Sequence, residues 1–205
     1  MNVFFLCNGS QSRFEGSGPK QLCEVEGEPL LVKMIGKVKK RGCDVRVFSH
    51  NEEIGDCVSS YGFPLTRLRP TDKLVETILA TQPFWEDRLI FYLGDVYLTD
   101  NALNIVLKDK SDIRFFGTWY ELFALTVAEY EHDRLYRNLI NAKSFSPGKL
   151  WHLFRSVMGV PLSEHNITKF REHVAYKRID DISDDVDTLK EYQRLLDNLK
   201  KEESG

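Results

Sequence analysis

Short apolar runs and amphipathic stretches alternate through the first half of the chain. Residues 3–7, 45–49 and 88–93 have the apolar, β-branched and aromatic character of buried strands. Between them, residues 30–40 and 72–81 carry apolar side chains at helical spacing. Such alternation is typical of a largely parallel sheet covered by helices. We therefore predict an α/β fold: a single three-layer domain with a mixed, mainly parallel sheet.

The remaining elements are predicted from the same signals, although the second half of the chain is less regular. Further helices are predicted over residues 51–60, 101–108, 133–142, 149–158 and 187–200, and further strands over residues 64–68, 113–118, 122–127 and 174–179. The last helix is amphipathic, and its inward-facing residues are predicted to be Leu189, Tyr192, Leu195, Leu196 and Leu199. We expect one domain over residues 1–200 and a frayed tail over residues 201–205.

Size and charge exclude several classes of protein. A chain of 205 residues is long enough to bury one sizeable core. Its formal net charge of -3 argues against binding nucleic acid by bulk electrostatics. No apolar run approaches membrane-spanning length, and no secretory signal is recognisable. The four cysteines form no C-x-x-C pair, which favours reduced thiols. We expect a cytoplasmic protein that binds neither nucleic acid nor membrane.

The loop after the first strand predicts a polyphosphate site. Gly9 lets backbone N–H groups approach an anion closely, and Arg13 and Lys20 supply two cations to neutralise it. The loop also lies beyond the carboxyl end of a strand, where open α/β sheets bind ligands. A P-loop is excluded because no Gly-Lys-Ser or Gly-Lys-Thr occurs, and Gly16 and Gly18 lie too far from the strand for a dinucleotide fingerprint.

This stretch is similar to the GT-A-type nucleotidyltransferases, the family that activates sugar phosphates, phosphocholine and related phosphates. The family pattern is a loop A-[AG]-G-x-G-x-R, then a lysine in a K-[PQ]-L context, then G-x-P-L. Residues 7–13, 19–22 and 27–31 follow that order and spacing. Gln11 stands where the family has its second glycine, and Asn8 replaces a small residue. These side chains would reshape the loop, restrict the nucleotide or weaken catalysis.

Two acidic segments extend the resemblance. Asp95 ends an apolar strand, as the family's metal-binding segment does, although a Gly-Asp turn explains it equally well. Near the C-terminus, Asp185 and Asp187 resemble the family's D-x-D-T-P-E-D segment. Thr188 and Glu191 also form a capping box, which is compatible with a metal role for the acids before them. The resemblance implies Mg²⁺ held by Asp95 and Asp187, with Asp185 as a further candidate.

The resemblance implies a reaction as well as a site. Arg13 and Lys20 would be the catalytic cations, offsetting charge on the β- and γ-phosphates as pyrophosphate leaves. The implied nucleotide-binding residues are Cys7, Asn8, Gly9, Ser10, Gln11, Ser12, Thr71 and Leu74. An NMP group would pass from an NTP, CTP being the first candidate, to a phosphorylated small molecule such as a sugar phosphate, as in nucleotide sugar biosynthesis. No histidine lies in the motifs, which suits a phosphate acceptor that arrives largely deprotonated. A homodimer is compatible with this interpretation.

Two other functions stay open. GT-A glycosyltransferases, which use nucleotide sugars, carry a D-x-D in mid-chain, where this chain has the lone Asp95. A nucleotide-binding module without turnover is compatible with Gln11. Thr71 and Asp72 are explained equally well as simple N-cap residues. The aromatic residues Trp119, Tyr120 and Trp151 are expected in the core rather than in an acceptor pocket.

Overall fold

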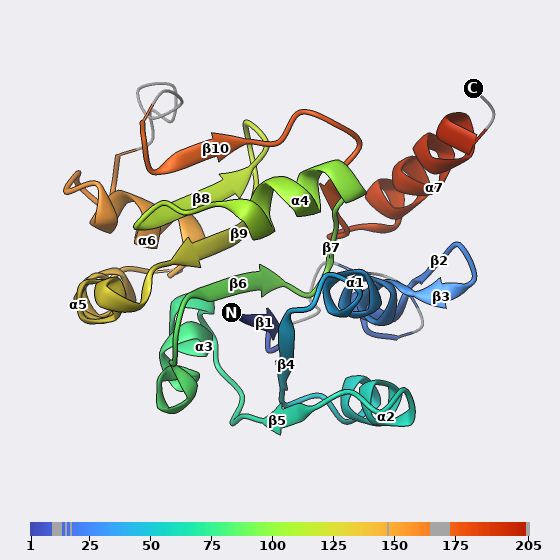
Figure 1. Cartoon of the computed structure of the whole chain (residues 1–205), viewed down its shortest axis with the longest axis horizontal. Helices are drawn as coiled ribbons and strands as arrows, with labels where there is room; N and C mark the ends of the chain where they lie inside the picture. Colours follow the sequence, from blue (N-terminus) through green and yellow to red (C-terminus); the bar gives the residue numbers. More distant parts are fainter. Residues whose placement is uncertain (10–13, 15, 17, 147, 165–172, 204–205) are drawn as a thin grey trace.

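A single seven-stranded sheet forms the centre of the molecule. The computed structural model describes residues 1–9, 14, 16, 18–146, 148–164 and 173–203. Within these residues the strands lie in the order β10-β8-β9-β6-β1-β4-β5, from top to bottom in Figure 1. β9 alone runs antiparallel to its neighbours, so the sheet is mixed and mainly parallel, as predicted. The strands are β1 (Asn2–Leu6), β4 (Asp44–Ser49), β5 (Leu65–Arg67), β6 (Leu89–Leu93), β8 (Ile113–Gly117), β9 (Leu122–Val127) and β10 (Tyr176–Arg178).

Helices cover both faces of this sheet and give the molecule three layers (Figure 1). Alternate side chains of β1 enter opposite clusters: Val3 and Phe5 pack on one face, and Phe4 and Leu6 on the other. The first face is covered by α1 (Leu30–Lys39), α2 (Glu52–Ser60), α4 (Asp100–Lys108) and α7 (Leu189–Glu203). The second is covered by α3 (Leu74–Ala80), α5 (His132–Lys143) and α6 (Leu150–Val157). The predicted α/β fold class is therefore confirmed.

Short elements complete the architecture. Among the described residues, 3-10 helices are present at Lys20–Leu22 (η1), Gln82–Phe84 (η2) and Glu129–Glu131 (η3). Short antiparallel pairs join β2 (Glu24–Val25) to β3 (Glu28–Pro29), and β7 (Val96–Tyr97) to β11 (Asp184–Asp185). None of these pieces was predicted, because two or three residues are too few to show a period.

Most predicted helices and strands are confirmed to within two residues, but three details differ. α3 begins at Leu74, and its cap residue Lys73 makes no side-chain cap bond, so the N-cap interpretation of Thr71 and Asp72 is wrong. The side chain of Leu189 is 45% exposed, which contradicts its predicted inward position. α7 continues to Glu203, past the predicted end of the helix. Among the described helices, none combines the length and the apolar character needed to cross a membrane.

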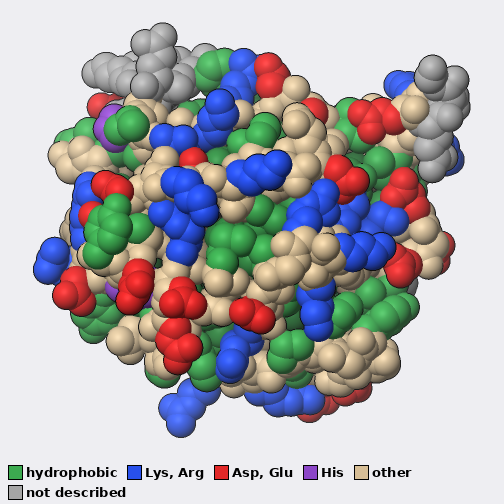
Figure 2. Space-filling view, viewed as in Figure 1, with side chains coloured by type: hydrophobic (Ala, Val, Ile, Leu, Met, Phe, Trp, Pro, Cys, Tyr) green, Lys and Arg blue, Asp and Glu red, His purple; other side chains and the backbone are tan. Residues whose placement is uncertain are grey.

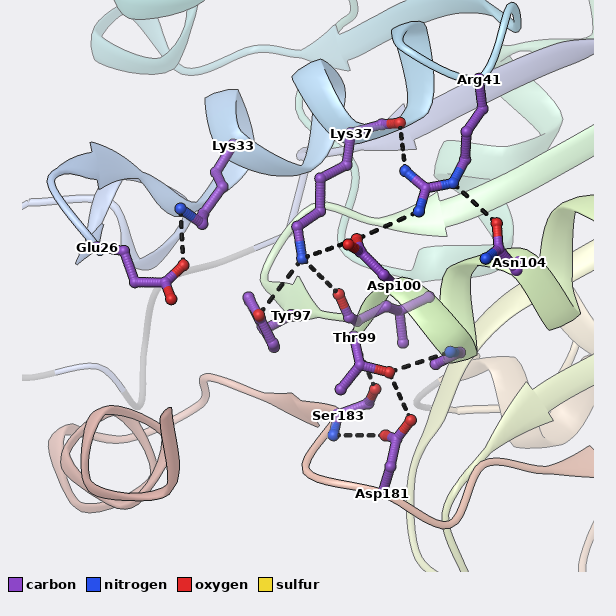
Figure 3. Close-up of polar contacts among 12 residues, drawn as sticks. Glu26, Lys33, Lys37, Arg41, Tyr97, Thr99, Asp100, Asn104, Asp181 and Ser183 are labelled. Carbon is purple, nitrogen blue, oxygen red and sulfur yellow. Dashed lines mark hydrogen bonds and ion pairs between the residues drawn. The ribbon is translucent and has the colours of Figure 1, made fainter. Parts of the chain in front are cut away.

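A charged surface lies over α1 and α4. Figure 2 shows Lys and Arg side chains gathered on this face, with acidic side chains among them. Asp100 accepts contacts from both Lys37, at 3.3 Å, and Arg41, at 3.2 Å, and the Arg41 Nε donates to Asn104 at 2.9 Å (Figure 3). These bonds tie the two helices together, with one carboxylate shared by two cations.

A second group of polar contacts fastens the chain just before β11 to the start of α4 (Figure 3). The Thr99 hydroxyl, which caps α4, donates to Asp181 at 2.6 Å, and the Thr99 backbone N–H donates to the Ser183 hydroxyl at 3.0 Å. The Ser183 N–H in turn donates to Asp181 at 2.8 Å. This loop therefore holds β11 beside β7.

Candidate active site

The ends of β1, β4 and β6 meet at one edge of the sheet. There the Cys7 N–H donates to the Phe48 carbonyl at 2.9 Å, and the Gly94 N–H donates to the Leu6 carbonyl at 3.1 Å. A Cβ at Gly94 would lie 2.2 Å from the Cys7 Sγ, a separation that real side chains do not adopt. Only glycine lets the end of β6 lie this close to β1, and that approach brings Asp95 beside the loop after β1.

Backbone pairing brings the two predicted acidic segments together, although some ninety residues separate them. In the β7–β11 pair, Asp185 lies opposite Val96, and the Val186 N–H donates to the Asp95 carbonyl at 2.9 Å. Asp95, Asp185 and Asp187 therefore line the same pocket. The structure confirms that these segments meet and leaves a metal role for them as a prediction.

The predicted capping box at the start of α7 is present. The Thr188 hydroxyl accepts from the Glu191 N–H at 3.2 Å and donates to the Glu191 carboxylate at 2.9 Å. The same carboxylate also accepts from the Asp187 backbone N–H at 3.1 Å. Glu191 therefore holds the backbone of Asp187 at the N-terminus of α7, in addition to its place in the capping box.

Lys20, in η1, directs its ammonium group between Asp95 and Asp187 and forms an ion pair with each of them. All three side chains are largely buried, with exposed fractions of 12%, 17% and 14%. Burial by itself lowers the pKa of Lys20, but the negative charge of Asp95 and Asp187 outweighs it and keeps the pKa above its ordinary value. The ammonium therefore stays charged and joins the N-terminal motif to both acidic segments.

A pocket of about 280 Å³ opens above this cluster. Of the predicted site residues, the pocket is lined by Asn8, Gly9, Lys20, Leu74, Asp95, Asp185 and Asp187. The side chain of Cys7 is buried in the core and the hydroxyl of Thr71 bonds to Asn8, so neither side chain is among the lining. The predicted residues Ser10, Gln11, Ser12 and Arg13 lie outside the described part of the chain.

Sequence reasoning missed one wall of the pocket. That wall is formed mainly by Glu121, Lys149 and Trp151. Trp151 was considered as a pocket residue but expected in the core; it lines the pocket, and its indole N–H donates to the Tyr120 carbonyl at 3.1 Å. Tyr120 is 74% exposed, so the core expectation is wrong for that residue. The one signal for this wall in the sequence is the aromatic cluster itself.

The carboxylates of the pocket repel one another. Burial, followed by the negative charges of Glu121, Asp95 and Asp187, raises the pKa of Asp185 to about 8. Within the described residues no three His, Cys, Asp or Glu side chains converge closely enough to hold a metal ion by themselves. Mg²⁺ prefers carboxylate oxygens, and it commonly takes only one or two of them and completes its shell with water and substrate phosphates. The donor set therefore fits Mg²⁺ shared with a phosphate ligand.

Sequence comparisons give no relative for this chain: no protein-family model matches it, and no curated protein matches it either. Comparison with solved structures does find similar folds. A nucleotidyl transferase from Methanothermobacter thermautotroptrophicus superposes with a TM-score of 0.66 at 13% identity, over 98% of this chain and 97% of that one. The inositol-1-phosphate CTP transferase from T. maritima gives a TM-score of 0.65 at 12% identity, over 97% and 96%.

HddC from Yersinia pseudotuberculosis, complexed with GMP-PN, gives a TM-score of 0.59 at 12% identity, over 97% of this chain and 99% of that one. These identities are too low to transfer an activity, but the coverage is nearly complete in both directions. The chain therefore has, along nearly its whole length, the fold of these three solved structures.

Proposed function

We propose that this chain is a nucleotidyltransferase, which transfers an NMP group from an NTP to a phosphorylated small molecule and releases pyrophosphate. The observation that carries this proposal is the buried cluster of Lys20, Asp95 and Asp187 at the carboxyl edge of the sheet, beneath an open pocket. The fold supports it, since proteins of that fold include an inositol-1-phosphate CTP transferase and a nucleotidyl transferase.

In the proposed reaction, an oxygen of the acceptor phosphate attacks the α-phosphorus of the NTP. The bond between the α-phosphorus and its bridging oxygen breaks, and pyrophosphate leaves with that electron pair. Lys20 would neutralise the charge that develops on the leaving group, in a partly buried site where such a cation acts strongly. Arg13 is proposed to share this role. An acceptor phosphate needs no general base, because its second ionisation lies near pH ~6.

We propose Mg²⁺ as the cofactor, held by Asp95 and Asp187 with Asp185 beside them. When bound, the metal would supply positive charge to the α-phosphate and the acceptor oxygen. The crowded carboxylates fit such an ion, because Asp185 lies among negative charges that a divalent cation would offset. Lys20 now pairs with the two acids that would hold the metal, so its ammonium would exchange one of these contacts for substrate phosphate.

The acceptor is proposed to lie against the wall formed by Glu121, Lys149 and Trp151. A lysine can attract its phosphate group, and an indole can pack against the apolar face of a sugar or polyol. CTP stays the first candidate donor and a sugar phosphate the first candidate acceptor.

The four cysteines are free thiols, which supports our proposal of a cytoplasmic protein. The homodimer stays a prediction.

Pyrophosphate release tests the proposal. The purified chain is incubated with each of the four NTPs, Mg²⁺ and a panel of sugar and alcohol phosphates, and pyrophosphate is measured over time. We expect release that requires one NTP together with one class of phosphate. Asp95→Asn should lower turnover by at least about a hundredfold, because it removes a carboxylate that would hold the proposed Mg²⁺.

The alternatives give different results in the same assay. Tight nucleotide binding without pyrophosphate in any mixture would indicate a binding module. If turnover appears only when a nucleotide sugar replaces the NTP, and no pyrophosphate forms, the chain is a glycosyltransferase. Either result would contradict the proposed function.

A further inference from the structure

Asn8 is a polar side chain buried to 1% exposure at the end of β1. Its amide nitrogen donates to the Arg69 carbonyl at 3.0 Å and to the Thr71 hydroxyl at 2.9 Å. A carbonyl can only accept, so the amide orientation is fixed and the Asn8 Oδ1 must face the His50 Nδ1, 2.7 Å away. That ring nitrogen therefore carries a proton and donates it. Both amide hydrogens of Asn8 are committed inside the protein.

The bonds continue beyond Asn8 on both sides. The Thr71 hydroxyl lies 2.6 Å from that of Thr77, on the buried side of α3. On the other side, the Ser49 hydroxyl donates to the Cys7 carbonyl at 2.9 Å, next to His50. One polar chain thus joins the end of β1, the end of β4 and the connection between β5 and α3.

The connection that Asn8 holds forms part of the pocket. Asp72 and Leu74 follow Thr71 directly and line the pocket together with Asn8. α3 begins without a side-chain cap, so its first turn gains no rigidity from a capping bond. The bonds from Asn8 to Arg69 and Thr71 therefore fix this wall relative to the sheet.

The chemistry of this wall indicates which part of an NTP it meets. Asp72 is acidic and would repel a polyphosphate, whereas a base or ribose can donate to a carboxylate and pack against Leu74. The phosphates instead suit the end of the pocket that holds Lys20.

We propose that Asn8, through His50 and Thr71, is a positioning residue that fixes the nucleoside-facing wall of the site. This inference rests on the proposed function, because it takes the ligand to be an NTP. Asn8 acts through the wall that it holds. Its presence in place of a small residue therefore stabilises one arrangement of the nucleoside site.

Hydrogen exchange and nucleotide affinity test the proposal together. Exchange of the amides of residues 68, 69 and 71–73 is measured without ligand for the unaltered chain, Asn8→Ala, Thr71→Val and Thr71→Ser. Affinity for each of the four ribonucleoside triphosphates with Mg²⁺ is measured by calorimetry. We expect faster exchange and about tenfold weaker binding in Asn8→Ala, in line with losing buried hydrogen bonds. Thr71→Val should behave similarly, and Thr71→Ser should restore both values because it keeps the hydroxyl.

Further measurements separate positioning from general stability. In turnover, Thr71→Val should raise KM for the NTP and leave both kcat and KM for the acceptor unchanged. Thr66→Val is the matched control, because this β5 residue also loses a hydroxyl but does not line the pocket. It should change neither exchange nor affinity.

Each remaining outcome has one meaning. Unchanged exchange in Asn8→Ala and Thr71→Val, or faster exchange with unchanged affinity, overturns the inference and leaves the proposed function intact. If the unaltered chain binds none of the four nucleotides, the proposed function is wrong and the inference falls with it.

Discussion

At the scale of single residues, the position of Lys20 has the clearest consequence. Its ammonium neutralises Asp95 and Asp187, so Lys20→Met leaves two largely buried carboxylates facing each other. We expect this variant to lose roughly 1–3 kcal/mol of unfolding free energy without metal, since buried charges lose their partner. Because the Lys20 ammonium no longer competes for these carboxylates, Lys20→Met should also bind Mn²⁺ more tightly in the absence of nucleotide.

Mn²⁺ titration followed by electron paramagnetic resonance measures that affinity, and thermal unfolding with and without Mn²⁺ measures the stability. Lys33→Met is the matched control, because Lys33 pairs with Glu26 at 2.7 Å, away from the pocket. If Lys20→Met binds Mn²⁺ no better than the unaltered chain, Lys20 does not compete with a metal for these acids.

The residue scale also shows what sequence reasoning can reach. Asp95 and Asp187 were predicted as partners because each belongs to a motif, and the structure brings them to one pocket. Thr71 was ambiguous in the sequence, since a threonine before a helix suits a cap. Its hydroxyl instead bonds to Asn8, a contact across sixty-three positions that no local pattern contains. Glu121 and Lys149 carried no motif at all.

At the scale of elements, the close approach of β6 to β1 depends on Gly94. In Gly94→Ala the new Cβ would overlap the Cys7 Sγ, so either the sulfur or one strand end must move. We expect a loss of about 1–3 kcal/mol in unfolding free energy, typical of overpacking. Chemical denaturation of Gly94→Ala, Cys7→Ala and the double variant forms a cycle that isolates this contact.

The double variant should be more stable than Gly94→Ala alone, because the sulfur that the new methyl meets is gone. Additive losses would mean that the Cys7 sulfur is not what excludes a side chain at position 94. Pyrophosphate release by the double variant would report how far the position of Asp95 depends on the close approach of β6 to β1.

Elements of five or more residues were predicted well because such segments are long enough to show the periodicity of their apolar residues. β4 and α1, for example, lie within a residue of their predicted bounds. β7 and β11 are two residues each, and the loop before β11, fastened to α4, holds them in place. Such tertiary bonds join distant segments, which a period along one segment does not encode.

At the scale of the whole molecule, the pocket gathers residues from nearly the full length of the chain. Its lining comes from Leu6, Asn8, Gly9, Lys20, Gln21, Asp72, Leu74, Leu93, Asp95, Glu121, Leu122, Lys149, Leu150, Trp151, Asp185 and Asp187. A ligand that contacts all these segments must dissociate before the chain can unfold. Binding therefore stabilises the folded state as a whole, by about 2.7 kcal/mol at a hundred times the dissociation constant.

A thermal-shift panel of the four ribonucleoside triphosphates uses this coupling to identify the donor. With Mg²⁺ present, we expect one nucleotide, CTP first, to raise the unfolding temperature more than the other three. Asp95→Asn should lose most of that rise because it removes a proposed ligand of the Mg²⁺ that the phosphates would share, whereas Thr66→Val should keep it. Equal shifts for all four nucleotides would mean that the site reads the triphosphate alone. In that case Asp72 and Leu74 would not discriminate between bases, and the donor would have to be found by turnover.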